Sequence, residues 1–169
     1  MTLADLNRLD QANFVAALAG IYEYSPWVPE RAWSRRPFVD INDLHAALAA
    51  VVAAAEKDEQ LALIRAHPEL AGKAMTDGSL TADSTAEQSR AGLMHCSPAE
   101  LARLRELNAR YNANFGFPFI LAVKGYDRAG VIAEFARRVD NDAAEEFAEN
   151  LRQIDKIARL RLDAVIDGR

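Results

Sequence analysis

Apolar residues recur every three or four positions along most of this chain, and that spacing restricts it to helices. Phe14 and Leu18 follow the spacing, as do Leu104 and Leu107 in a later segment. Residues at this interval share one face of an α-helix. Proline or glycine interrupts the pattern repeatedly. We therefore predict an all-α bundle of about six to eight helices, ending in one long amphipathic helix over residues 141–167.

The length and composition predict one domain. The chain has 169 residues, and 50% of them are hydrophobic, which suffices for one core without metal or disulfide support. The sequence contains neither an internal repeat nor a change in composition that would mark a linker. We therefore predict a single domain over residues 1–169.

The charge balance argues against two classes of partner. The formal net charge is −5, so the chain offers no broad positive field for nucleic acid or anionic lipid. No apolar run approaches the roughly 20 residues that cross a bilayer. The only cysteine, Cys96, cannot form an internal disulfide, and the first residues do not resemble a signal peptide. We predict a cytoplasmic protein that binds neither nucleic acid nor membranes.

His67 is the first candidate for chemistry. It lies in RAHPELA and directly precedes Pro68, which disfavours helix for His67 and suits the first turn of a following helix. We therefore expect His67 at the mouth of a helix, where it could transfer protons or hold an anion. An ordinary surface or capping histidine is the alternative. His45 and His95 have no partner at metal-ligand spacing, so no metal site is predicted.

Two readings remain open for the segment STAEQSRAGL. Ser84 and Glu87 have the spacing of a capping box, in which the two side chains would satisfy backbone N–H groups at a helix start. Alternatively, Glu87 and the adjoining Gln88 could grip a ligand rich in amide or urea groups, because an amide both donates and accepts hydrogen bonds.

Arg161 lies where a charge is not expected. In the C-terminal segment Ile154, Ala158 and Arg161 follow one another at spacings of four and three, so Arg161 falls on the apolar stripe. Arg159 lies off that stripe. Because burying an unpaired charge costs several kcal/mol, Arg161 needs a partner. That partner is either an acidic side chain of the chain or a ligand with carboxylate or carbonyl oxygens.

The segment FGFPFILAVKG, residues 115–125, places two aromatics around a proline before an apolar run. It is either a buried strand or a rigid wall of a small-molecule pocket.

Five blocks, taken in order, resemble the family of 2-oxo-4-hydroxy-4-carboxy-5-ureidoimidazoline (OHCU) decarboxylases. The resemblance extends over nearly the whole chain. Tyr24 departs from it, because the family often has histidine there. The blocks are IYEYSPWV (21–28), RAHPELA (65–71), STAEQSRAGL (84–93), FGFPFILAVKG (115–125) and IDKIARLRL (154–162).

The resemblance implies a cofactor-independent homodimer that converts OHCU to (S)-allantoin and CO2 in urate breakdown. It also implies a set of site residues. Catalytic roles fall to His67, Glu87 and Arg161, and substrate contacts to Pro68, Ser84, Gln88, Phe117, Phe119, Ile120, Leu121 and Ala122. The competing interpretation is a helical binding or adaptor protein without catalysis. An association with other ureide enzymes is a second alternative.

Overall fold

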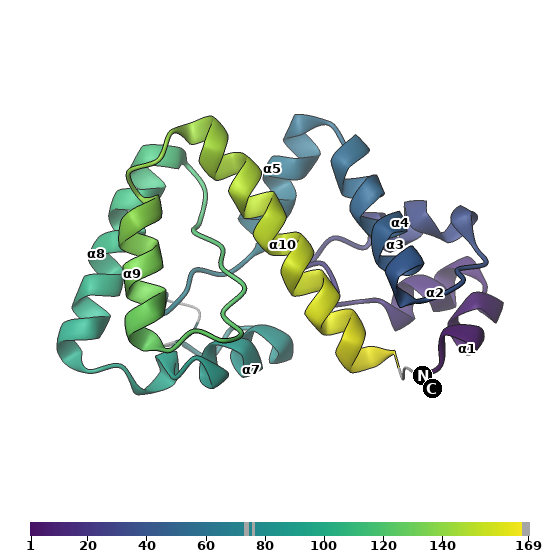
Figure 1. Ribbon diagram of the computed structural model, residues 1–169, viewed down its shortest axis with the longest axis horizontal. Helices are drawn as coiled ribbons and strands as arrows, with labels where there is room; N and C mark the ends of the chain where they lie inside the picture. Colours follow the sequence, from purple (N-terminus) through teal and green to yellow (C-terminus); the bar gives the residue numbers. More distant parts are fainter. Residues whose placement is uncertain (73–74, 76, 167–169) are drawn as a thin grey trace. The chain divides into compact units, whose positions relative to one another are not determined.

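The chain divides into two compact units. The computed structural model describes residues 1–72, 75 and 77–166. Unit 1 comprises Met1–Ala66 with Asp155–Arg169, and unit 2 comprises His67–Ile154. The regular elements of the described residues are all helices (Figure 1), which confirms the all-α prediction. The prediction of one domain over the whole chain stays a prediction.

Nine α-helices lie within the described residues, against the six to eight predicted. Two of them, α1 and α3, have six residues each, too few for an apolar period to show. The long C-terminal helix is confirmed. The helices are α1 Leu3–Arg8, α2 Gln11–Ala17, α3 Trp27–Ala32, α4 Ile41–Ala54, α5 Lys57–Ala66, α7 Ala82–Arg90, α8 Pro98–Phe115, α9 Arg128–Arg138 and α10 Ala143–Val165, with 3₁₀ turns at Trp33–Arg35 and Leu93–His95.

Short side chains fix where the helices begin. Ser97 and Glu100 form a capping box at the start of α8, with Pro98 in the first turn. The Ser97 hydroxyl accepts the Glu100 N–H at 3.2 Å, and the Glu100 carboxylate accepts the Ser97 N–H at 2.7 Å. At the other end, Gly116 takes a left-handed conformation with φ +72° and ends α8.

Unit 1 packs its helices around a mainly aliphatic core. Phe14 and Leu18, predicted from their spacing, are buried. The last part of α10 contributes to this core, since its residues from Asp155 onward belong to unit 1. Other fully buried side chains of unit 1 are Leu6, Val28, Ala32, Leu44, Leu48, Leu63, Ile64, Ala158 and Leu162.

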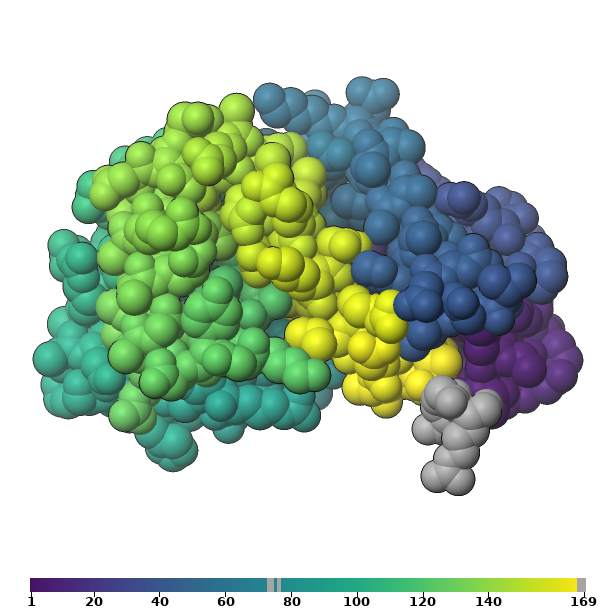
Figure 2. Space-filling model, in the orientation of Figure 1, coloured from purple at the N-terminus to yellow at the C-terminus, as the bar shows by residue number. Residues whose placement is uncertain are grey.

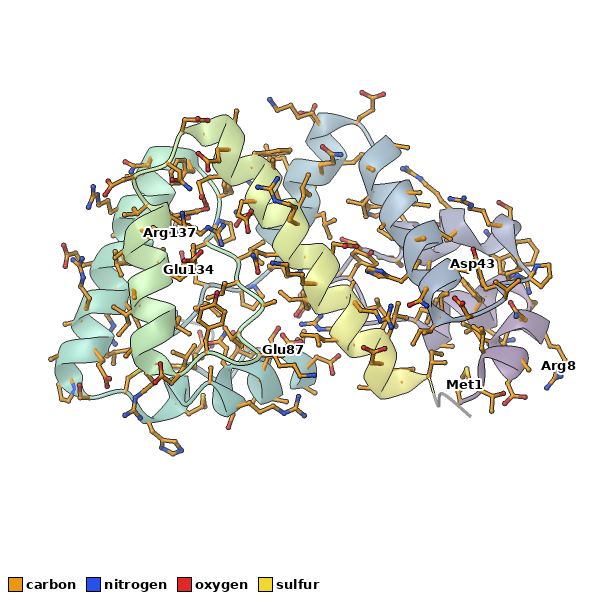
Figure 3. The ribbon with its side chains drawn as sticks, in the orientation of Figure 1. Met1, Arg8, Asp43, Glu87, Glu134 and Arg137 are labelled. Carbon is orange, nitrogen blue, oxygen red and sulfur yellow. The ribbon has the colours of Figure 1, made fainter. Side chains whose placement is uncertain are left out.

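Unit 2 has an aromatic core built around Tyr111 of α8. The Tyr111 ring meets Phe119 edge to face with centroids 5.4 Å apart, and it meets Phe135 of α9 in the same way at 5.6 Å. Such edge contacts suit the charge distribution of aromatic rings. The opposite side of α9 lies on the surface in the view of Figure 2. It carries the ion pair between exposed Arg137 and half-buried Glu134, both labelled in Figure 3.

None of the helices in the described ranges combines the length and the apolar character needed to cross a membrane.

Candidate active site

His67 lies in a loop, not at a helix mouth as predicted. It directly follows α5, and the residues after it form an irregular stretch and then a turn at Leu70 and Ala71. The helix expected to begin at Pro68 is not there, because side chains from two other helices take the backbone groups of this loop. His67 itself is 6% exposed. The loop of residues 67–72 therefore presents a nearly buried imidazole.

Amide side chains hold this loop in a conformation that it would not adopt alone. The Ala71 N–H donates to the Gln88 side-chain oxygen at 3.0 Å, and the Gln88 amide nitrogen donates to the Glu69 carbonyl at 3.4 Å. From α8, the Asn108 amide donates to the Leu70 carbonyl at 2.9 Å. Ala71 has φ +50°, a left-handed conformation that is unfavourable for a residue with a Cβ. These contacts dock the His67 loop onto α7 and α8.

The N-cap of α7 is Thr81, so the capping-box interpretation of Ser84 and Glu87 was wrong. The Thr81 hydroxyl accepts the Ser84 N–H at 3.3 Å, which places Ser84 inside the first turn of the helix. A cap three residues earlier leaves Glu87 (Figure 3) well inside α7. Ser84 and Gln88, one helical turn apart, are 4% and 2% exposed. Capping therefore does not account for Glu87.

We expect Thr81→Ala to lower the free energy of unfolding by about 1 kcal/mol, because it removes the hydroxyl that accepts the Ser84 N–H. Thr81→Ser keeps that hydroxyl and should leave stability nearly unchanged. Urea unfolding followed by far-UV circular dichroism measures both variants. Equal midpoints for the alanine and serine variants would show that Thr81 does not cap α7.

The segment of residues 117–122 is not a strand, and its two aromatic rings are packed against other rings. It has no regular secondary structure. Phe117 is 5% exposed and Phe119 1% exposed. Phe117 meets the ring of Phe147 at 6.0 Å, and Phe119 stacks on Phe135 at 3.9 Å. Both rings belong to the core of unit 2, and their predicted substrate contacts stay predictions.

The backbone of this segment is fixed by side chains of α10. The Ile120 N–H donates to the Asn150 side-chain oxygen at 3.1 Å, and the Ala122 N–H donates to that of Gln153 at 3.0 Å. The two donors are two residues apart, the period of an extended chain, so the Leu121 N–H points away from α10. Within the described ranges the Leu121 N–H donates no hydrogen bond. The N–H groups of Phe117 and Phe119 likewise donate no hydrogen bond within these ranges. In an extended chain the Phe119 N–H points the same way as that of Leu121, so these two are the donors that the segment can offer a ligand.

Arg161 belongs to unit 1 and has an ion-pair partner there. Its guanidinium donates to the Glu23 carboxylate at 3.2 Å and to the Gly20 carbonyl at 2.7 Å. The side chains of Arg161 and Glu23 are 5% and 2% exposed. Arg159, by contrast, is half-exposed and pairs with Asp163. The predicted burial of Arg161 is confirmed, and the acidic partner is supplied by the chain.

Unit 2 also contains a cavity of about 390 Å³ beside the His67 loop, lined by Glu69, Ala71 and Gly72 and by residues of α8 such as Arg105 and Asn108. His67, Ser84 and Glu87 are not among its lining residues. No group of three or more histidine, cysteine, aspartate or glutamate side chains in the described part of the chain has the geometry to hold a metal ion.

Comparison with known proteins identifies the family of this chain. The model of the OHCU decarboxylase family matches residues 7–163. The chain belongs to the OHCU decarboxylase family. The OHCU decarboxylase of Haloferax volcanii is 42% identical over 163 residues, which cover 96% of this chain and 94% of that protein. That of Mus musculus is 39% identical over 162 residues, 96% of this chain and 91% of that protein.

A solved structure agrees with the family assignment. The crystal structure of an (S)-allantoin synthase matches with a TM-score of 0.78 and 33% identity. The match covers 99% of this chain and 55% of that one, so the chain spans about half the length of that protein. As an OHCU decarboxylase, the chain is a carboxy-lyase of urate degradation.

Proposed function

We propose that unit 2 decarboxylates OHCU to (S)-allantoin at a site formed by the His67 loop, α7 and residues 117–122. The observation that supports this site most directly is the double contact of Gln88 with the loop, through the Ala71 N–H and the Glu69 carbonyl. It joins the loop that carries His67 to the helix that carries Glu87. α8 extends the connection, since Asn108 holds the loop and Tyr111, almost one turn later, contacts Phe119.

The substrate supplies its own electron sink. Its carboxylate is attached to a ring carbon next to a C=N bond, so the electron pair released with CO2 can move onto that nitrogen. The protein must orient the carboxylate, stabilise the negative charge of the enol-like intermediate and deliver a proton to one face of the ring. Proton delivery to one face makes the product (S)-allantoin rather than a racemate.

The geometry suggests a role for each segment. His67, nearly buried, acts as the acid/base that moves a proton to or from the substrate. Glu87 accepts hydrogen bonds from substrate N–H groups, with Ser84 assisting one turn earlier. The Gln88 amide has two donors and two lone pairs, of which the loop uses one each, so it can contact substrate while holding the loop. The negative charge placed on the ring nitrogen is shared with the oxygen of the neighbouring ring carbonyl, and the Leu121 N–H donates to that oxygen.

Pro68 and Arg161 complete the predicted set. Pro68 fixes the backbone directly after His67 through its restricted φ. The contribution of Arg161 to catalysis stays a prediction, since its guanidinium already binds Glu23 and Gly20.

The activity is tested by circular dichroism at an allantoin band. Urate is converted by urate oxidase and the hydrolase that follows it, with and without this protein. We expect a single-handed allantoin signal to appear much faster in its presence. A trace no faster than spontaneous decay to racemic allantoin, from a folded sample, would contradict the proposal and favour a non-catalytic binding protein.

We further propose that the protein is a cytoplasmic homodimer. The support comes from the family resemblance and from Cys96, whose lack of an internal partner suits a reducing compartment. Light scattering coupled to size exclusion measures the mass in solution, and a monomer would contradict the dimer.

A further inference from the structure

We propose that four buried polar side chains, Arg138, Glu146, Asn150 and Gln153, form a positioning network that fixes residues 118–122 for catalysis. The inference rests on the proposed function, because it gives these side chains a role in aiming the Leu121 N–H at substrate. They lie on α9 and on the first part of α10, all within unit 2.

The ion pair at the centre of the network is fully buried. The side chains of Arg138 and Glu146 are both 0% exposed, with Nη2 of Arg138 2.8 Å from the Glu146 carboxylate. Tyr111 donates its hydroxyl to the same carboxylate. Burial, followed by this contact with Glu146, raises the pKa of Tyr111 and keeps it a donor. A buried ion pair often stabilises a fold no more than apolar residues would, so its presence calls for a use besides stability.

That use is visible in the remaining contacts of Arg138. Its Nη1 donates to the Ile120 carbonyl at 2.8 Å, and its Nη2 also donates to the Asn150 oxygen at 2.8 Å. Its guanidinium lies 4.4 Å from the centre of the Phe119 ring, which stacks on Phe135. Glu146 thus binds one edge of the Arg138 guanidinium. The rest of the guanidinium contacts the Ile120 carbonyl and the Phe119 ring.

Asn150 and Gln153 bind backbone groups of the segment at every second residue. The Asn150 amide donates to the Pro118 carbonyl at 2.9 Å and accepts the Ile120 N–H. Gln153 accepts the Ala122 N–H, and its own amide is held by Glu149 at 2.6 Å. The backbone groups of residues 118, 120 and 122 are therefore all bound by side chains of α9 and α10. No strand in the described part of the chain pairs with this segment, so these side chains replace the ladder that would otherwise set its register.

The arrangement determines where the Leu121 N–H points. An oxyanion donor is effective only when it is already aimed at the position where charge develops. A misplacement of about 1 Å can cost about 100-fold in rate. The network is thus a set of positioning residues that act on substrate through the backbone.

Two substitutions test the network at different points. Asn150→Asp keeps the acceptor for the Ile120 N–H but loses the donor to Pro118. Gln153→Leu removes the acceptor for the Ala122 N–H. The double variant Gln153→Glu/Glu149→Gln retains an oxygen there and, because it exchanges the carboxylate and the amide, sets no two carboxylates against each other. We expect Asn150→Asp and Gln153→Leu to lower kcat by about 10-fold to 100-fold with a smaller change in KM. Gln153→Glu/Glu149→Gln should retain most of the wild-type kcat.

Val131→Ala is the matched control, because Val131 is fully buried in α9 and makes none of these polar contacts. It should lower the melting temperature but leave kcat per folded molecule within about twofold. If Gln153→Leu, or a folded Asn150→Asp, keeps wild-type kcat, the network is only structural. If Asn150→Asp does not fold, the kcat values of the Gln153 variants alone decide whether the network positions the segment. An inactive wild type overturns the proposed function, whereas an active wild type with unaffected variants overturns only the network.

Discussion

Replacing His67 by alanine is expected to lower kcat by about 10²-fold to 10⁴-fold, the usual contribution of a positioned acid/base. The imidazole is nearly buried, and its loop is docked onto α7 by Gln88. No other histidine belongs to the segments proposed for the site, so none can take its place. The coupled urate assay measures the rate of (S)-allantoin formation.

The control for His67 is His95→Ala. His95 is exposed at the end of a 3₁₀ turn, and no site role is proposed for its side chain. Its replacement should leave kcat and the pH profile unchanged. Unfolding curves for both variants confirm that the folded fraction is equal. Wild-type decarboxylation with an unchanged pH profile in His67→Ala would eliminate the acid/base role.

Removing the Glu23 carboxylate is expected to cost about 3–5 kcal/mol of stability, because that carboxylate pairs with the buried Arg161 guanidinium. Both side chains are nearly inaccessible to water. Thermal and urea unfolding of Glu23→Ala measure the loss. The double variant Glu23→Leu/Arg161→Met should recover most of it, since it removes both charges and keeps the volume.

An exposed ion pair provides the comparison. Arg159→Ala breaks the half-exposed contact with Asp163 and should change stability little. The same variants separate the two roles of Arg161. If Glu23→Leu/Arg161→Met is folded at the assay temperature and retains wild-type kcat and KM, Arg161 is structural only. A large loss of kcat in that folded variant would support a catalytic role.

Local patterns were sufficient to predict the helical fold and the long C-terminal helix. Phe14, Leu18, Leu104 and Leu107 are buried as their spacing indicates. The stripe of α10 correctly placed Arg161 inside. The same reasoning would have found Arg138, which follows Val131 and Phe135 at spacings of four and three. A charge at such a position was therefore a detectable sign of the network.

Local patterns could not predict contacts between residues that are far apart in the sequence. Thr81 and Ser84 are both good capping residues, and only the fold decides which of them begins α7. Arg161 finds Glu23 across 138 positions of sequence, so its acidic partner could not be read from spacing. The loop after His67 is not helical because Gln88 and Asn108, far along the chain, bind its backbone.

The left-handed backbone at Ala71 limits which sequences can keep this loop. Glycine would fit there without strain, and alanine is tolerated because Gln88 binds its N–H. Valine and isoleucine would be excluded, since a branched Cβ makes a positive φ much more unfavourable. Ala71 is also 1% exposed, which disfavours polar side chains such as that of asparagine, a residue that otherwise tolerates a positive φ. Substitution at position 71 should therefore be confined to the two smallest residues in any relative that holds its histidine in the same way.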